Sequence, residues 1–151
     1  MTPLRKKQET SDSPTVRLSM GVENYLLSIF QLGEQNRRVT LTELADQLKR
    51  LPEGEGLGTS LPSVGAMVRR MARESLVEIT MDKEVLLTLK GRRVAESMVR
   101  RHRLAERMVV DLLGLELHKS HVEAHRLEHA ISLDLEKKII DRLGNPTTCP
   151  F

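Results

Sequence analysis

Four side chains of types that bind divalent metals recur at helical spacing between residues 121 and 129. His125, Glu128 and His129 follow His121 at spacings of four, seven and eight residues. With 3.6 residues per helical turn, these spacings place all four side chains on one stripe of a helix. Imidazole and carboxylate groups bind borderline divalent cations when several of them converge from a rigid surface. The pattern therefore predicts a metal site on this helix.

His102 and Glu106 form a second pair of this kind, four residues apart on what we expect to be the preceding helix. The alternative is that an amphipathic helix carries histidines on its solvated face, and for any single histidine that interpretation is the better one. For the whole set we favour a metal site, because only Arg126 and Leu127 separate His125 from the next two ligand-type residues.

The composition favours packed helices. A chain of 151 residues suits one compact unit or two small ones, and should bury roughly two-thirds of its unfolded surface. Tyr25, Phe30 and Phe151 are the only aromatic residues and there is no Trp, so Leu, Val, Ile and Met must form the core.

The charge is unevenly divided along the chain. The net charge is +3, but residues 1–110 hold 19 Lys and Arg against 14 Asp and Glu, whereas residues 111–151 hold 5 against 7. A basic segment is the one to test for nucleic-acid binding.

Several features indicate a cytoplasmic protein. Cys149 is the single cysteine, which excludes an intramolecular disulfide and fits a reducing compartment. No apolar run approaches the ~18 residues of a membrane span. Residues 1–12 are charged and polar without the apolar core of a signal peptide, so we expect residues 1–18 to be a disordered, partly basic arm.

Residues 19–89 read as a winged helix-turn-helix. Apolar residues recur at helical spacing from Ser19 to about Gly33. Thr40 and Glu43 form a capping box for a short helix over 41–49, and the glycine-rich stretch 51–59 is a long loop. Ser60 caps a third helix, with Pro62 in its first turn. Two β-biased runs, 77–81 and 84–89, then predict a hairpin.

Residues 90–144 read as a helical domain, which makes the fold class mainly α. Thr88 can cap a helix over 90–113 that Gly114 closes, a second helix over 118–131 carries the ligand stripe, and Ser132 caps a last helix over 133–143. The chain has no glycine-rich phosphate loop and no nucleophile elbow.

The third helix is the candidate DNA-recognition helix, because the first residues of the second helix of a helix-turn-helix face the major groove. Arginines on the outward side suit phosphate contacts, which position a protein but do not specify sequence. The alternative is a solvated, arginine-rich face. The candidate DNA-binding residues are Ser60, Ser63, Gly65 and Ala66 at the groove, Arg69, Arg70 and Arg73 for phosphates, and Lys83 at the wing tip.

Several segments resemble the diphtheria toxin repressor family, the iron- and manganese-dependent repressors. Residues 101–107, 112–115 and 121–129 resemble its dimerisation domain. Residues 23–26 and 62–64 resemble its first helix and the start of its recognition helix. The resemblance implies a homodimer that binds operator DNA when metal is bound, and two metal sites per subunit.

The resemblance also implies which residues bind metal. The ancillary site maps onto His102, Glu106 and His121, and the primary site onto Asn24, His125, Glu128 and His129. Iron regulators of the family usually have Met and Cys at the positions of Asn24 and His125, and manganese regulators Asp and Glu, so the chain meets neither pattern. Residues 51–59 are an insertion, and residues 145–151 resemble the linker to an SH3-like domain, as expected of a two-domain or a truncated member.

The predicted function is a metal-dependent repressor that senses Mn²⁺ or Fe²⁺, with Mn²⁺ favoured, and shuts down metal-uptake genes. Asn24 lies on the first helix of the DNA-binding unit, so a bound ion ties that unit to the dimerisation helices. The alternatives are a metal-independent winged-helix regulator and a helical metalloenzyme. Di-metal helical enzymes use paired Glu-x-x-His motifs; none occurs here, and no nucleophile or base is left once the ligands are assigned. We therefore predict that the protein is not an enzyme.

Overall fold

A computed structural model describes residues 18–51 and 58–144. Nearly all of the expected N-terminal arm, most of the loop 51–59 and the tail 145–151 lie outside the described residues.

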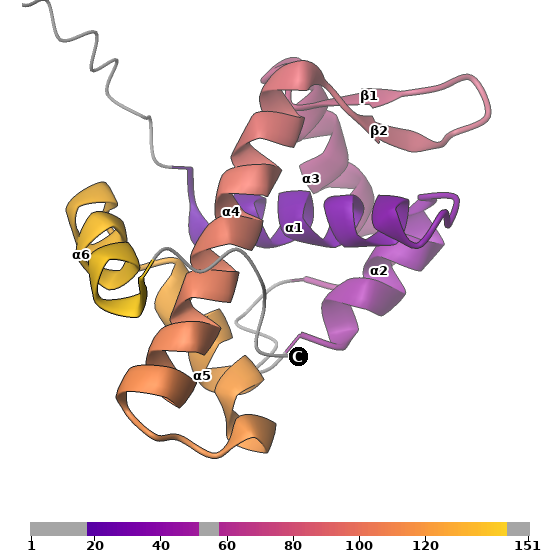
Figure 1. Ribbon diagram of the computed structural model, residues 1–151. Coiled ribbons are helices and arrows are strands. Elements are labelled where there is room, and N and C mark those ends of the chain that lie inside the picture. The colour runs from indigo at the N-terminus through magenta and orange to yellow at the C-terminus, as the bar shows by residue number, and fades with distance from the viewer. Residues whose placement is uncertain (1–17, 52–57, 145–151) are drawn as a thin grey trace, which may run out of the picture.

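The described chain is mainly helical, with one short hairpin (Figure 1). In chain order the elements are α1 (Met20–Glu34), α2 (Leu41–Lys49), α3 (Leu61–Arg73), β1 (Val77–Ile79), β2 (Val85–Leu87), α4 (Leu89–Arg107), the π-helical turn η1 (Met108–Leu112), α5 (Leu117–Glu128) and α6 (Leu133–Leu143).

Side-chain hydroxyl groups fix where most of the helices begin. Thr40 Oγ1 accepts a hydrogen bond from the Glu43 amide at 3.2 Å, and Ser60 Oγ accepts one from the Ser63 amide at 3.3 Å. Ser19, Thr88 and Ser132 cap α1, α4 and α6 in the same way. Each cap satisfies a backbone amide that has no partner inside its helix. The predicted starts at Thr40, Ser60, Thr88 and Ser132 are therefore confirmed.

The first three helices and the hairpin form the predicted winged helix-turn-helix. Their shared core includes Leu26, Leu32, Leu44 and Val64, all fully buried. The strands are antiparallel with Val77 paired to Leu87. This hairpin is the wing. A hydrogen bond from the Val85 amide to the Val39 carbonyl, 2.8 Å long, joins it to the segment between α1 and α2.

Helix α4 connects the two halves of the molecule (Figure 1). Its first turn lies against the segment between α3 and β1, and a Cβ atom on Gly91 would come within 2.0 Å of the Leu76 carbonyl oxygen. Only glycine fits this close approach. Further along, α4 packs on α1 and α5, and the second core lies between the last helices, where Leu104, Ala124 and Ile139 are buried.

The helix ends differ from the prediction in two places. The helix expected over 90–113 changes to a π-turn at Met108, where the Leu113 amide bonds to the Met108 carbonyl five residues back. Helix α5 ends at Glu128 and not near Ile131, so His129 is its C-cap and its ring is placed by a helix end. No helix among the described residues is long and apolar enough to cross a membrane.

Candidate metal centre

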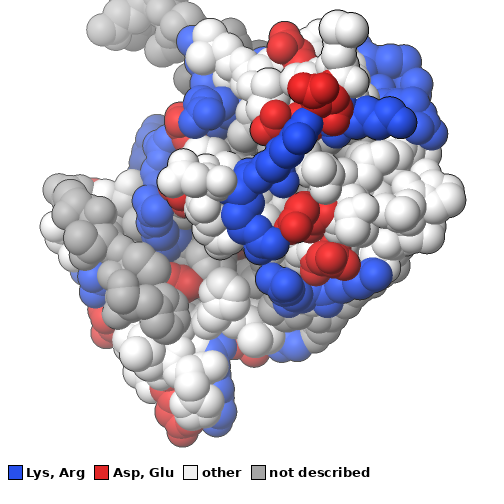
Figure 2. All heavy atoms as spheres, turned by 90° about the vertical axis from the view of Figure 1, so that its right-hand side faces the viewer, with Lys and Arg blue, Asp and Glu red and all other residues white. Residues whose placement is uncertain are grey.

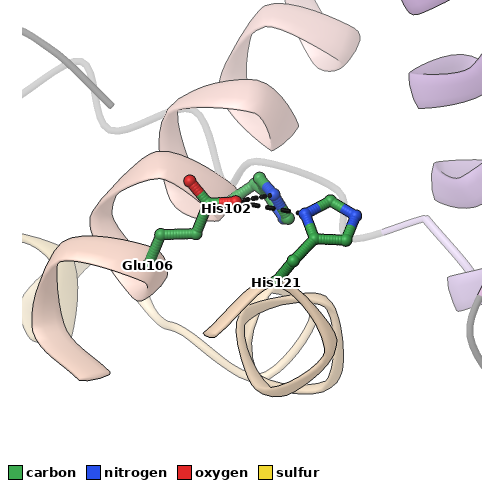
Figure 3. A group of neighbouring side chains, drawn as sticks. All are labelled: His102, Glu106 and His121. Carbon is green, nitrogen blue, oxygen red and sulfur yellow. Dashed lines mark hydrogen bonds and ion pairs between the residues drawn. The ribbon is translucent and has the colours of Figure 1, made fainter. Parts of the chain in front are cut away.

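His102, Glu106 and His121 form a cluster between α4 and α5 (Figure 3). Glu106 Oε1 lies 2.7 Å from His102 Nε2 and 3.2 Å from His121 Nδ1. One potential ligand atom from each residue lies within 4.8 Å of the others. Glu106 is buried, whereas the His121 side chain is 56% exposed, so this cluster opens to solvent. The structure thus brings together the three residues expected for the ancillary site.

His102 also belongs to a second, buried cluster with His125 and Glu128. Its Nδ1 lies 2.5 Å from Glu128 Oε2, while Glu128 Oε1 lies 2.9 Å from His125 Nδ1. Glu128 is fully buried. One ring nitrogen of His102 therefore faces each carboxylate, and the imidazole stands between the two clusters.

The two carboxylates control the charge of His102. Burial alone would lower its pKa, but the hydrogen bonds and charges of Glu106 and Glu128 outweigh burial and raise the pKa to about 9. Burial likewise opposes ionisation of Glu128, yet His102 and His125 hold the pKa of its carboxyl below the usual range. A divalent cation in this cluster would take over the charge balance that the His102 proton supplies.

Glu23, a residue that the sequence analysis did not assign to the site, contacts the Nδ1 atom of His129. His129 Nδ1 lies 2.8 Å from Glu23 Oε2, and Glu23 Oε1 lies 3.4 Å from Arg101 Nη2. His129 Nε2 is 3.6 Å from Glu128 Oε1. A usable signal existed, because Glu23 lies in a largely apolar part of α1 and a buried carboxylate needs a partner.

All four residues expected for the primary site have a buried atom without a hydrogen-bond partner in the described structure. These atoms are Asn24 Oδ1, His125 Nε2, His129 Nε2 and Glu128 Oε1, the last of which lies 2.9 Å from His125 Nδ1 as an ion pair. Nearly all buried polar atoms in proteins are hydrogen-bonded, so such atoms call for an explanation. Oxygen and imidazole nitrogen are donors that divalent metals accept. The residues present therefore fit a bound divalent cation.

Comparison with known proteins agrees with this chemistry. Residues 88–151 match the family described as iron dependent repressor, metal binding and dimerisation domain. This segment belongs to that family. The resemblance to the diphtheria toxin repressor family, predicted from short motifs, is confirmed.

Relatives extend the likeness to the winged helix in front of this iron dependent repressor domain. The chain is 39% identical over 129 residues to the iron-dependent repressor IdeR of Mycobacterium tuberculosis (strain H37Rv), covering 85% of this chain and 52% of that protein. It is 36% identical to the diphtheria toxin repressor of Corynebacterium efficiens, with the same coverage. A solved manganese-dependent transcriptional repressor in complex with manganese superimposes with a TM-score of 0.72 at 35% identity, covering 85% of this chain and 55% of that one. The chain thus spans about half the length of the curated relatives it matches.

The winged helix exposes most of the predicted DNA-binding residues. Ser60, Ser63 and Ala66 are exposed at the start of α3, and the arginines at 69, 70 and 73 are exposed further along it. Gly65 differs from the prediction, because it is buried against Leu41 of α2. We therefore do not expect Gly65 to contact a base.

The arginines of α3 differ from those beside the wing. Figure 2 faces the wing turn and the ends of α1 and α2, where Lys and Arg side chains alternate with Asp and Glu. After the end of α1, Arg37 pairs with Glu43 of α2 at 2.5 Å, and Arg38 lies within 4.0 Å of Glu84, next to β2. On α3, Arg70 pairs with Glu74, and within the described part of the chain no ion pair joins Arg69 or Arg73 to an acid. These two arginines are the better candidates for phosphate contacts.

Proposed function

We propose that the chain is a homodimeric, metal-activated transcriptional repressor that senses Mn²⁺ or Fe²⁺ and binds the operators of metal-homeostasis genes. One observation carries the proposal. Asn24 on α1, and His125 and His129 at the end of α5, each have a buried ligand-type atom with no hydrogen-bond partner in the described structure. These donors come from both halves of the molecule, so a ligand that satisfies them contacts both.

The proposed primary site comprises Asn24, His125, Glu128 and His129, and the proposed ancillary site comprises His102, Glu106 and His121. When bound, the metal supplies positive charge and fixed coordination geometry. Two observations support the role proposed for Glu128 in the primary site: it is fully buried, and it contacts the rings of His102 and His125. Glu106 has the same role toward His102 and His121.

We further propose that the two domains are residues 19–89 and 90–144. Asn24 is on α1 of the winged helix, whereas His125 and His129 are on or next to α5. Occupation of the primary site would stabilise one docking of the first domain on the second. In a homodimer this docking sets the separation of the two α3 helices, which must be about 34 Å to reach successive major grooves. Metal affinity and DNA affinity are then coupled reciprocally.

The donor set also bears on the choice of metal. The proposed primary site has no thiolate or thioether, the ligands that favour softer ions, and Asn24 offers oxygen, which suits manganese. We propose that Mn²⁺ activates at least as well as Fe²⁺. Both metals appear among the relatives, since IdeR is named an iron-dependent repressor and the solved relative a manganese-dependent one.

The test is DNA binding by the purified chain with Mn²⁺, Fe²⁺, Zn²⁺ or chelator, using genomic fragments retained in the presence of Mn²⁺. We expect retention of specific fragments that chelator abolishes and Mn²⁺ restores. Specific retention that is equal with metal and with chelator would favour the alternative, a metal-independent winged-helix regulator. No specific retention under any condition would contradict both.

A further inference from the structure

Glu23 is a buried carboxylate in the first turn of α1. It is 4% exposed, and α1 is buried on both sides of it, at Val22 and from Asn24 to Ile29. Burying a carboxylate costs several kcal/mol unless charged or hydrogen-bonding groups compensate for the lost water. The structure supplies two such groups, and each contacts a different oxygen of the carboxylate.

The first partner is the His129 ring. With 2.8 Å between His129 Nδ1 and Glu23 Oε2, the Nδ1–H group donates a hydrogen bond to the carboxylate. In a neutral imidazole this leaves the lone pair on Nε2. That atom is buried and has no hydrogen-bond partner in the described structure. The contact therefore fixes both the orientation of the ring and the nitrogen available to a metal.

The second partner is Arg101 on α4. Its Nη2 lies 3.4 Å from Glu23 Oε1, and the residue is itself only 8% exposed. The guanidinium balances the charge of Glu23, which matters because Glu128 brings a second carboxylate within 3.6 Å of the same imidazole. The pair with Arg101 uses only Glu23 Oε1. The hydrogen bond from His129 to Glu23 Oε2 is therefore a separate contact, which charge balance with Arg101 does not require.

We propose that Glu23 is a positioning residue for the metal centre, which orients His129 and holds its Nε2 ready to bind a divalent cation. The proposal rests on the proposed function and adds a residue to it. Carboxylates that accept the second N–H of a metal-binding histidine raise its basicity and fix its tautomer. Because Glu23 is on α1, the winged helix supplies both Asn24 and the group that prepares His129. Metal affinity then depends on how α1 docks, beyond any bond from Asn24.

The test compares Glu23→Gln with Glu34→Gln. The first substitution keeps the size of the side chain but removes its charge, and Glu34 is an exposed glutamate at the other end of α1. Mn²⁺ affinity is measured by electron paramagnetic resonance, and the site geometry by the visible spectrum of bound Co²⁺. We expect Glu23→Gln to weaken Mn²⁺ binding by about 10- to 100-fold and to alter the Co²⁺ spectrum. Glu34→Gln should change neither, and Glu23→Asp should recover part of the affinity.

Other outcomes overturn the proposal. If Glu23→Gln melts earlier in chelator but binds Mn²⁺ and Co²⁺ as the unchanged protein does, Glu23 is only a structural ion-pair partner. Should the variant not fold, nitrogen NMR of the unchanged protein at mildly alkaline pH decides, because His129 must then carry its proton on Nδ1; a proton on Nε2 refutes the assignment. Failure of the proposed function looks different, since the unchanged protein would then bind neither metal.

Discussion

The two histidine clusters on α5 differ in what they join. His102, Glu106 and His121 all come from α4 and α5, and the cluster is open to solvent at His121. The set around His129 is buried and includes contacts to Glu23 on α1, 106 residues away in sequence. We propose that a cation in the first cluster would stiffen only the pair of helices α4 and α5. A cation bound by Asn24, His125 and His129 would hold the winged helix against the proposed helical domain, so we expect that site to control DNA binding.

The largest effect should follow from removing His129. We predict that His129→Ala abolishes metal-dependent DNA binding, because it removes a buried donor and the contact of α5 to Glu23, while the dimer stays folded. The measurement is an electrophoretic shift with Mn²⁺ or chelator, together with sedimentation. His118→Ala is the matched control, since the His118 side chain is 73% exposed, lies beside Glu116 and belongs to neither ligand cluster. A shift that stayed metal-dependent in His129→Ala would remove this residue from the primary site.

The second prediction concerns the identity of the metal and separates tight binding from activation. Zn²⁺ should bind more tightly than Mn²⁺ or Fe²⁺ under the general order of divalent metals, yet it prefers four ligands and can be satisfied without Asn24. We therefore expect Zn²⁺ to activate less than Mn²⁺, with Mn²⁺ at least equal to Fe²⁺.

Metal affinity and operator affinity measured side by side decide this. If activation simply followed metal affinity, with Zn²⁺ the best corepressor, the geometric argument would be wrong. Asn24→Ala supplies the control, because it should weaken activation by Mn²⁺ much more than binding of Zn²⁺.

A smaller effect is expected at the open cluster. We predict that His121→Ala weakens Mn²⁺ activation by about tenfold or less, because His102 and Glu106 remain and the lost ligand is mostly exposed. The DNA shift should still depend on metal, and titration of DNA binding with Mn²⁺ measures the change. Complete loss, equal to that of His129→Ala, would mean that the open cluster also couples the domains.

Local sequence signals predicted the helices and the open cluster well. The hydroxyl caps at Thr40 and Ser60 act within three residues, and the pair His102 and Glu106 lies one turn apart on a single helix, so spacing alone reveals them. The family resemblance supplied Asn24 as a proposed metal ligand. No helical spacing connects Asn24 to the other candidate ligands.

Features that depend on packing were missed. Glu23 finds its partners 78 and 106 residues later, at Arg101 and His129, and no spacing rule connects such positions. Gly65 was expected at the DNA surface, but it is buried, with Leu41 of the neighbouring helix and the Arg69 side chain beside it. The contact of His102 with Glu128 likewise depends on how α4 meets α5. In each case the missing information was the relative placement of helices.

The smallest effect is expected away from both clusters, on α3. Arg70 is exposed, and its pairing with Glu74 at 3.1 Å is of the i,i+4 type that contributes only about 0.3–0.5 kcal/mol, so a phosphate can compete for the guanidinium. We predict that Arg70→Ala weakens binding about equally on all DNA sequences. The plot of log DNA affinity against log salt concentration should become less steep by about one unit, and Mn²⁺ affinity in the absence of DNA should not change. Glu74→Gln is the opposite control, because freeing the guanidinium should leave the slope intact and binding equal or tighter.

Loss confined to one base position would instead make Arg70 a base reader. A change in Mn²⁺ affinity without DNA would show that α3 already communicates with the metal centre in the free protein, and the separation drawn between the two regions would fail.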